Sequence, residues 1–125
     1  MSKNRWMILF LPILILVILL VTYPLPDNEN TDDKIYIDMT TEQFEFSPVE
    51  IRVKSGARVV INLTSIDVLH GFGITEYGIY ESVAPGETII IEFTADKQGI
   101  YEIYCTDFCG TGHPLHKGLL IVDEW

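Results

Sequence analysis

Cysteine, histidine and basic residues are scarce in this chain of 125 residues. It contains 2 cysteines, 3 histidines and 8 lysines and arginines against 18 acidic residues, for a formal net charge of -10. Residues 26–125 hold 6 of the basic residues and all 18 acidic ones, which gives that part a charge of -12. So acidic a surface repels a phosphate backbone, which argues against nucleic-acid binding. The length excludes a large multidomain enzyme and fits one ordinary domain.

Acidic residues are absent from the first 25 residues, which contain the uncharged apolar run from Trp6 to Tyr23. At about 1.5 Å per residue, a helix of this length just spans a hydrocarbon core about 30 Å thick. We therefore expect residues 1–25 to be a single-pass anchor in the lipid of the cell membrane. Lys3 and Arg5 precede the run and the acidic residues follow it, so the positive-inside rule predicts a cytoplasmic N-terminus and an extracytoplasmic domain.

A cleaved secretory signal is the alternative interpretation of this N-terminal segment. The apolar run is longer than the usual hydrophobic region of a signal, and residues 21–26 offer no cleavage site between small residues. No cysteine follows the run closely, which excludes a lipid-modified cysteine at that point. A retained anchor is therefore the preferred interpretation.

Helical periodicity, internal repeats and low-complexity tracts are absent from the rest of the chain. Residues 26–34 have the composition of a short linker, and residues 35–125 show a period of two that is interrupted by Gly, Pro and Asp. This pattern predicts a sandwich of short strands of the Greek-key type, with a single core. The predicted strands are Ile35–Thr40, Val49–Val53, Arg58–Thr64, His70–Ile74, Gly78–Ser82, Glu87–Thr94, Gly99–Tyr104 and Gly118–Val122.

The chemically reactive residues concentrate near the C-terminus. Four of the five histidines and cysteines fall within twelve residues, at Cys105, Cys109, His113 and His116, while His70 begins a predicted strand. Thiolates and imidazoles are the ligands that copper and zinc select. A loop between two strands at one end of a sandwich can converge on a residue of another strand. The sequence therefore predicts a metal site.

Each donor also has an interpretation without a metal. Two cysteines outside the cytoplasm usually form a disulfide, and a lone histidine such as His70 is usually a core or surface residue. A disulfide across so short a loop removes little chain entropy, however, and leaves the clustering of the histidines unexplained. The alternative that remains is a structural or binding sandwich whose cysteines are joined to each other.

The donor count alone leaves the metal open. One copper needs two imidazoles, one thiolate and a weak axial ligand, which His70, Cys109, His113 and residue 116 supply without Cys105. Two thiolates four residues apart can instead bridge two copper ions, each with one terminal imidazole, and this uses every donor. Zinc with two cysteines and two histidines is the third possibility, although His113 and His116 are closer than in usual finger spacing.

Several motifs resemble the copper A domain of heme-copper oxidase subunit II. They are residues 65–72 (SIDVLHGF), 83–87 (VAPGE), 99–101 (GIY) and 105–113 (CTDFCGTGH). The resemblance covers the whole predicted external domain in order, and the single anchor is similar to the short one-helix branch of the family. It implies an all-β, cupredoxin-like sandwich that holds a binuclear copper centre.

The resemblance also implies a set of ligands. By this resemblance, Cys105 and Cys109 bridge the two coppers, His70 and His113 are terminal ligands, and the backbone carbonyl of Asp107 is a weak axial ligand. Family members carry Glu or Gln at the position of Asp107. Because only the backbone carbonyl is used there, this departure is minor.

His116 is the larger departure, because the family has a methionine three residues after the second histidine. A thioether is a weak axial donor, whereas an imidazole is a stronger donor that favours oxidised copper. We expect His116 to coordinate axially and to lower the reduction potential relative to a methionine version. The alternatives are that His116 points away and leaves that copper three-coordinate, or that the site assembles one copper.

The resemblance implies an electron-accepting subunit II of a membrane heme-copper terminal oxidase. A soluble cytochrome c or small copper protein would supply electrons, and a heme-bearing subunit I would reduce oxygen, so this chain would be a non-catalytic part of a cytochrome c oxidase. An acidic domain suits a basic carrier. The alternatives are a membrane-tethered copper electron carrier or copper-delivery module without an oxidase partner, and the copper A subunit of a nitric oxide reductase.

Overall fold

The computed structural model describes residues 12–19 and 34–124 of a chain that divides into two units, residues 1–31 and 32–125. Residues 12–19 are an exposed helix and belong to the predicted membrane run. Within the described segments, no helix combines the length and the apolar character needed to cross a membrane. The rest of the predicted anchor, and the predicted linker apart from residue 34, lie outside the described residues.

Residues 34–124 form nine strands and two short 3-10 helices. The strands are β1 (Lys34–Glu42), β2 (Glu45–Ser47), β3 (Glu50–Lys54), β4 (Ala57–Ser65), β5 (His70–Ile74), β6 (Ile79–Val83), β7 (Thr88–Ala95), β8 (Gly99–Tyr104) and β9 (Lys117–Asp123). The 3-10 helices are η1 (Thr75–Tyr77) and η2 (His113–Leu115). This part of the chain is therefore all-β, as the sequence predicts.

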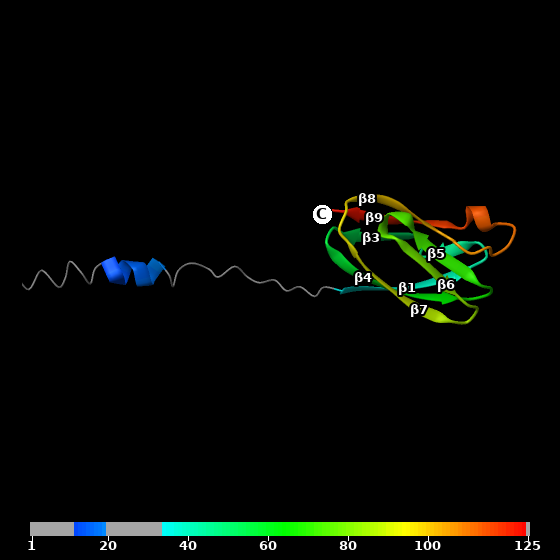
Figure 1. Ribbon diagram of the computed structural model, residues 1–125, viewed down its shortest axis with the longest axis horizontal. Helices are drawn as coiled ribbons and strands as arrows, with labels where there is room; N and C mark the ends of the chain where they lie inside the picture. Colours follow the sequence, from blue (N-terminus) through cyan, green and yellow to red (C-terminus); the bar gives the residue numbers. More distant parts are fainter. Residues whose placement is uncertain (1–11, 20–33, 125) are drawn as a thin grey trace, which may run out of the picture. The chain divides into compact units, whose positions relative to one another are not determined.

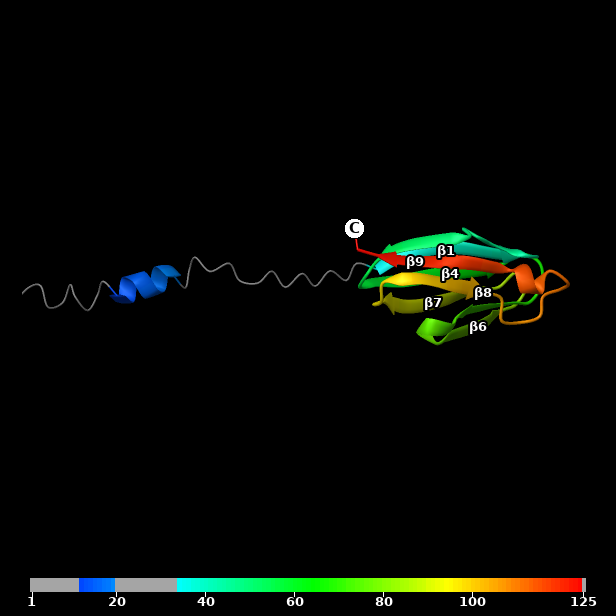
Figure 2. The ribbon, with the colours of Figure 1, turned by 90° about the horizontal axis from the view of Figure 1, so that it is seen from above.

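The strands form two sheets whose order differs from their order in the chain. One sheet has the order β2-β1-β4-β7 and the other the order β3-β9-β8-β5-β6 (Figure 1). Neighbouring strands are antiparallel except for the pairs β1–β4 and β3–β9, which are parallel. Figure 2 shows that the strands run along the length of the domain and that the β8–β9 loop projects at one end.

A single core lies between the sheets, because alternate residues of the strands point inward. In β4, Val59, Ile61 and Leu63 are fully buried, and in β5 Phe72 and Ile74 are fully buried. Burial of each such side chain contributes about 1.5–3 kcal/mol, which makes this core the main source of stability. The cluster also includes Cys105 and Cys109, so the core continues up to the predicted metal site.

The predicted strands agree closely with the observed ones. Strands β5 and β8 have the predicted bounds, and the ends of the others differ by one or two residues. Strand β2 was not predicted, because it contains three residues that end just before Pro48. It forms where Thr41 and Phe46 pair across the β1–β2 turn, so its formation depends on the strand beside it.

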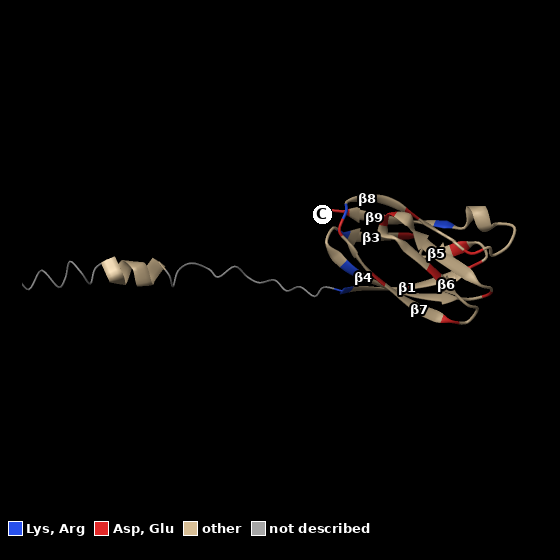
Figure 3. Ribbon diagram, viewed as in Figure 1, with Lys and Arg blue, Asp and Glu red and all other residues tan. Residues whose placement is uncertain are grey.

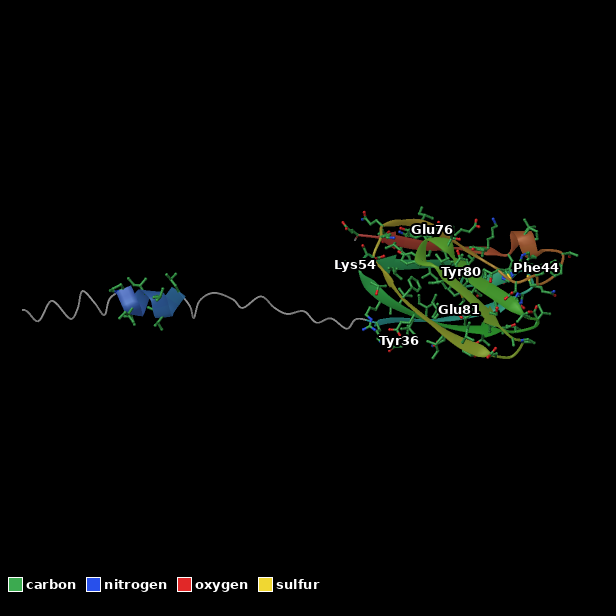
Figure 4. The ribbon with its side chains drawn as sticks, in the orientation of Figure 1. Tyr36, Phe44, Lys54, Glu76, Tyr80 and Glu81 are labelled. Atoms are coloured by element: carbon green, nitrogen blue, oxygen red, sulfur yellow. The ribbon has the colours of Figure 1, made fainter. Side chains whose placement is uncertain are left out.

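Three connections meet at one end of the domain. They are the β1–β2 turn, the β4–β5 loop of residues 66–69 and the β8–β9 loop of residues 105–116. Gln43 joins all three, because its backbone N–H donates to Asp67 Oδ2 at 2.8 Å and its Nε2 donates to the Cys109 carbonyl at 2.6 Å. Figure 4 shows Phe44 at this end of the domain, with Lys54 at the other.

Candidate metal centre

His70 reaches the site from the first residue of β5. Its side chain is fully buried, and its Nε2 lies 2.6 Å from Asp67 Oδ1, three residues earlier in the loop. The other ring nitrogen, Nδ1, lies 4.0 Å from Cys105 Sγ. The contact with Asp67 therefore fixes the ring so that Nδ1 faces the cysteines.

Glycines in β5 allow the β8–β9 loop to lie directly on that strand. A Cβ atom at Gly71 would lie 2.0 Å from Thr106 Oγ1, and one at Gly73 would lie 2.6 Å from Thr106 Cγ2. The close approach lets the Gly71 N–H donate to Cys105 Sγ at 3.4 Å. Side chains at either position would push the cysteine loop away from His70.

Glycines also shape the second half of the β8–β9 loop. Gly110 has a φ of 134°, a conformation that favours glycine. A Cβ atom at Gly112 would lie 2.3 Å from Phe44 Cδ2, so the Phe44 ring packs flat on the loop. The turn of η2 follows, and the Cys105 N–H donates to the His116 carbonyl at 3.1 Å, which closes the loop.

Four donors form a compact buried cluster. His70, Cys105, Cys109 and His116 each offer one ligand atom, and these atoms lie within 4.8 Å of one another. The two sulfur atoms are 3.5 Å apart and the thiols are free, whereas a disulfide bond is about 2.05 Å long. His116 Nδ1 lies 3.5 Å from Cys109 Sγ, so His116 points toward the cysteines and not away from them.

A second group of donors shares the same sulfur atoms. His113 Nδ1 lies 3.6 Å from Cys109 Sγ, and the Asp107 carbonyl oxygen lies 3.1 Å from Cys105 Sγ. His113 is partly exposed, and the centroid of its ring lies 5.7 Å from that of the exposed Phe108 ring. All six predicted site residues are therefore brought together, four in the cluster and two beside it.

Burial controls the protonation of the Cys109 thiol and of His116. It raises the pKa of Cys109 to about 12, and the neighbouring Cys105 adds to the shift. Burial also lowers the pKa of His116, as does the charge of His70, although a backbone hydrogen bond with Glu45 acts in the opposite direction. The imidazole of His116 is therefore held neutral, which is the form that binds a metal.

The Asp67 carboxylate keeps its charge beside His70. Burial acts to raise the pKa of Asp67, but hydrogen bonds with His70 and with the backbone N–H groups of Gln43 and Val68 outweigh it and hold the pKa below its usual value. A carboxylate that accepts a hydrogen bond from a histidine orients the ring and strengthens it as a ligand. Asp67 is thus suited to support His70.

The donor set is better explained by a copper site than by a structural cluster without a metal. The thiols of Cys105 and Cys109 are free and buried, and a soft cation bound beside them would supply the charge that balances their thiolate forms. Thiolate and imidazole donors are those that copper selects. His113 and the Asp107 carbonyl lie against the same two sulfur atoms as the four clustered donors.

Sequence reasoning did not find three residues that support the ligands. The first, Asp67, had a usable signal, because it is an acid three residues before a predicted ligand. The second, Thr41, lies 75 residues from His116, and its Oγ1 is 3.0 Å from His116 Nε2. Neither Thr41 nor Gln43, the third, carries a local signal, because their contacts depend on how the sheets are arranged.

Comparisons with known proteins agree with the fold and the site. The family described as the cupredoxin-like domain matches residues 12–122. Cytochrome c oxidase subunit 2 of Thermus thermophilus is 38% identical over 81 residues, which are 65% of this chain and 60% of that protein. Nitrous-oxide reductase of Pseudomonas fluorescens is 34% identical over 108 residues, which cover 78% of this chain and 17% of that enzyme.

A solved structure has the same fold. The periplasmic domain of subunit II of cytochrome oxidase of Bradyrhizobium japonicum superimposes with a TM-score of 0.66 and 21% sequence identity, over 72% of this chain and 84% of that one. The chain spans less than two thirds of the curated relatives named above, so the match concerns only part of each of those proteins. With its nine strands in two sheets and its family match over residues 12–122, the chain belongs to the cupredoxin-like domain family.

Proposed function

We propose that this chain is the electron-accepting subunit II of a membrane heme-copper terminal oxidase, with a binuclear copper A centre. The observation that carries the proposal is the arrangement of the donors, in which two free thiols 3.5 Å apart are shared by two donor groups. When bound, two copper ions bridged by thiolates exchange single electrons with little rearrangement of their ligands. The chain's own residues hold the ligands in fixed positions and exclude water.

Two ions account for the donors better than one. His70 and His116 with the two cysteines would satisfy a single ion. That arrangement leaves His113 Nδ1, 3.6 Å from Cys109 Sγ, and the Asp107 carbonyl without a role. We therefore assign Cys105 and Cys109 as bridging ligands, His70 and His113 as terminal ligands, and His116 and the Asp107 carbonyl as axial ligands.

The sandwich holds the ligands rigidly, which supports electron transfer with a small reorganisation energy. His70 is held by Asp67, the cysteine loop is held by Gln43, and both cysteines belong to the core cluster. Ligands that cannot move keep similar positions in the oxidised and reduced states, which lowers the reorganisation energy. A metal-delivery role would favour ligands that can be released easily, so the buried cluster supports electron transfer.

The surface around the centre supports docking of a soluble electron donor. Ile66, Leu69, Phe108 and Leu115 are exposed apolar residues in the two loops that carry or flank the ligands. Figure 3 shows most of the lysines and arginines at the other end of the domain, with one acidic residue in β6 and others at the loops near the centre. A basic cytochrome c or small copper protein would meet a complementary surface there.

The proposal includes the location of the chain. The apolar run from Trp6 to Tyr23 would anchor it in the lipid of the cell membrane, with the N-terminus in the cytoplasm and the copper domain on the extracytoplasmic face. Residues 1–25 would be the anchor, 26–34 the linker and 35–125 the copper domain. The anchor would keep the centre beside a heme-bearing subunit I, where oxygen is reduced.

Purification of the full chain from its own membranes tests this proposal. A tagged chain, solubilised in mild detergent, is expected to co-purify with a membrane subunit that has a heme absorption spectrum and to contain copper. A reduced soluble carrier should then reduce the heme in the complex. A variant with both Cys105→Ser and Cys109→Ser should keep the heme subunit but lose the copper and this electron transfer.

The other functions give different results in the same experiment. A chain that contains copper without a heme subunit would indicate a tethered copper carrier or delivery module, and would contradict the oxidase proposal. A complex that reduces nitric oxide but not oxygen would identify a nitric oxide reductase. A colourless chain with no free thiols would identify a structural sandwich.

A further inference from the structure

His116 has a polar partner at each nitrogen of its ring. Its Nδ1 lies 3.5 Å from Cys109 Sγ, and its Nε2 lies 3.0 Å from Thr41 Oγ1. Both His116 and Thr41 have a relative exposure of 0%. Since neither side chain is accessible to solvent, these two contacts, together with the backbone hydrogen bond between His116 and Glu45, decide which ring nitrogen carries the proton.

The two contacts favour one tautomer if Nδ1 is a ligand. A neutral imidazole has one N–H group and one nitrogen with a free lone pair, and only the lone pair can bind a metal. If the unprotonated Nδ1 faces the cysteines, the proton is on Nε2. The Nε2–H group then donates a hydrogen bond to the Thr41 hydroxyl oxygen. A buried N–H that loses an acceptor is less well satisfied, so loss of the hydroxyl, which leaves the Glu45 backbone as the remaining partner beside the cysteine, would weaken the preference for this tautomer and for this ring orientation.

Thr41 is held in place by strands on both sides. Its backbone pairs with Phe46 of β2 and with Ser65 of β4, and its carbonyl accepts a hydrogen bond of 2.9 Å from the Ile66 N–H. The Phe46 ring packs against the His116 ring with centroids 4.3 Å apart and a tilt of 38°. The hydroxyl and the ring plane are therefore both fixed by the sandwich.

We propose that Thr41 is a positioning residue that fixes His116 in the Nε2–H tautomer and so directs its Nδ1 lone pair toward the copper centre. A methionine at position 116 would have no N–H group to donate to Thr41. The role of Thr41 therefore depends on the histidine at position 116, which is where this chain departs from the sequence pattern it resembles. The inference rests on the proposed function and adds to it a residue that controls the axial ligand.

The test uses the full chain in detergent and three substitutions. Thr41→Val removes the hydroxyl at nearly constant volume, Thr41→Ser keeps it, and His116→Met removes the ring that Thr41 contacts. Copper affinity, the visible absorption spectrum and the reduction potential are measured on the copper-loaded protein. Nitrogen-15 NMR shifts of the His116 ring are measured on the metal-free protein.

We expect Thr41→Val to weaken copper binding by about 10- to 100-fold and to shift the absorption spectrum and the potential, since loss of such supporting partners has effects of this size. Thr41→Ser should match the unmodified chain. In the His116→Met background, Thr41→Val should change neither the spectrum nor the potential. Equal effects of Thr41→Val in both backgrounds, or no effect in either, would overturn the inference.

The NMR measurement separates this inference from the proposed function. An Nε2–H tautomer in the unmodified chain that is lost in Thr41→Val supports the role of Thr41, even if the chain fails to bind two coppers. An Nδ1–H tautomer in the unmodified chain overturns it, and this result needs no variant that folds. A chain that binds two coppers but does not respond to Thr41→Val overturns the role of Thr41 alone.

Discussion

Burial holds two ionisable side chains of the centre, Cys109 and His116, in their neutral forms. The pKa of Cys109 is raised to about 12 by burial and by Cys105, while burial and the charge of His70 lower the pKa of His116. A metal ion must displace the thiol protons when it binds, so copper loading should release protons. Because the raised pKa of Cys109 disfavours its thiolate, the site should favour a soft cation that binds thiolates strongly.

The identity of residue 116 should control the reduction potential of the centre. In His116→Met, a weak thioether replaces an imidazole whose Nδ1 lies 3.5 Å from Cys109 Sγ. Because the stronger imidazole donor favours oxidised copper, the methionine variant should have a higher potential and a shifted absorption spectrum. Spectroelectrochemical titration of the copper-loaded full chain measures both.

Leu115→Met is the matched control for this substitution. It adds a thioether one residue before His116, at the end of η2, but Leu115 is 81% exposed and belongs to neither donor group. It should therefore leave the potential and the spectrum unchanged. If His116→Met behaves like Leu115→Met, the axial role of His116 is wrong.

At the scale of elements, the metal loop depends on the β1–β2 turn that packs against it. The Phe44 ring contacts Gly110 and Gly112, and Gln43 donates to the Cys109 carbonyl. These contacts join the edge of one sheet to the ligand loop of the other. The turn is therefore part of the site, although it contributes no ligand.

Gly112→Ala should loosen this contact. The new Cβ atom would lie 2.3 Å from Phe44 Cδ2, and Gly112 has a φ of -87°, which alanine adopts without strain. Overpacking of this kind costs about 1–3 kcal/mol, so the midpoint of chemical denaturation should fall and copper should be released more readily. In a Phe44→Ala background, which removes the obstructing ring, Gly112→Ala should lower the stability of the fold much less. Equal costs in both backgrounds would show that the clash is not the cause.

Ion pairs on the outer face of the four-stranded sheet should make a pH-dependent contribution to the stability of the fold. Glu92 Oε1 lies 2.7 Å from Arg58 Nη2 and 3.3 Å from Lys34 Nζ, and its contacts with Lys34 and Arg58 lower its pKa below 4.5. A lowered carboxyl pKa means that the stabilisation is present above pH 4.5 and is lost as the pH falls through the lowered value. Because Glu92 is exposed, the effect should be small and should weaken with salt.

Glu92→Gln tests this contribution directly. The variant should have a slightly lower thermal midpoint than the unmodified chain at pH 7, and the difference should shrink as the pH falls below 4.5 and through the lowered pKa of Glu92. Glu81→Gln is the control, since Glu81 has no ion-pair partner among the described residues. A difference for Glu92→Gln that persists at pH 3 would exclude the ion pairs as its cause.

Features of the fold that depend on neighbouring residues could be predicted from the sequence more fully than contacts between residues far apart in the chain. Strands β5 and β8 were predicted with their bounds, because a period of two and flanking turn residues define them. The parallel pairing of β1 with β4, and of β3 with β9, was not predictable, since it depends on how the two sheets close around the core. The six donors were predictable because five of them lie in one loop, whereas Thr41 is 75 residues from its partner.

At the scale of the whole molecule, charge is distributed unevenly. The described residues 34–124 include 6 basic and 14 acidic residues, and Figure 3 shows the basic ones mainly at the end opposite the metal loop. Long-range attraction between such a surface and a basic carrier raises the association rate more than the affinity. The charge distribution is therefore expected to govern how fast electrons arrive.

Reduction of the copper-loaded full chain by a basic cytochrome c should slow steeply as the salt concentration rises. Between about 20 mM and 300 mM salt, the Debye length shortens and screens the attraction. Stopped-flow measurement of the second-order rate, with a neutral chemical reductant as the control, gives this dependence. A rate for the cytochrome that is as insensitive to salt as the control would show that charge does not guide docking.

The central claim is that two neighbouring sulfur atoms hold two copper ions in electronic contact. The most direct measurement is the copper content of the purified full chain together with the electron paramagnetic resonance spectrum of its oxidised form. We expect two coppers per chain and hyperfine structure from two equivalent copper nuclei, since the donors form two groups around shared sulfurs. One copper per chain with a single-nucleus pattern would contradict the account.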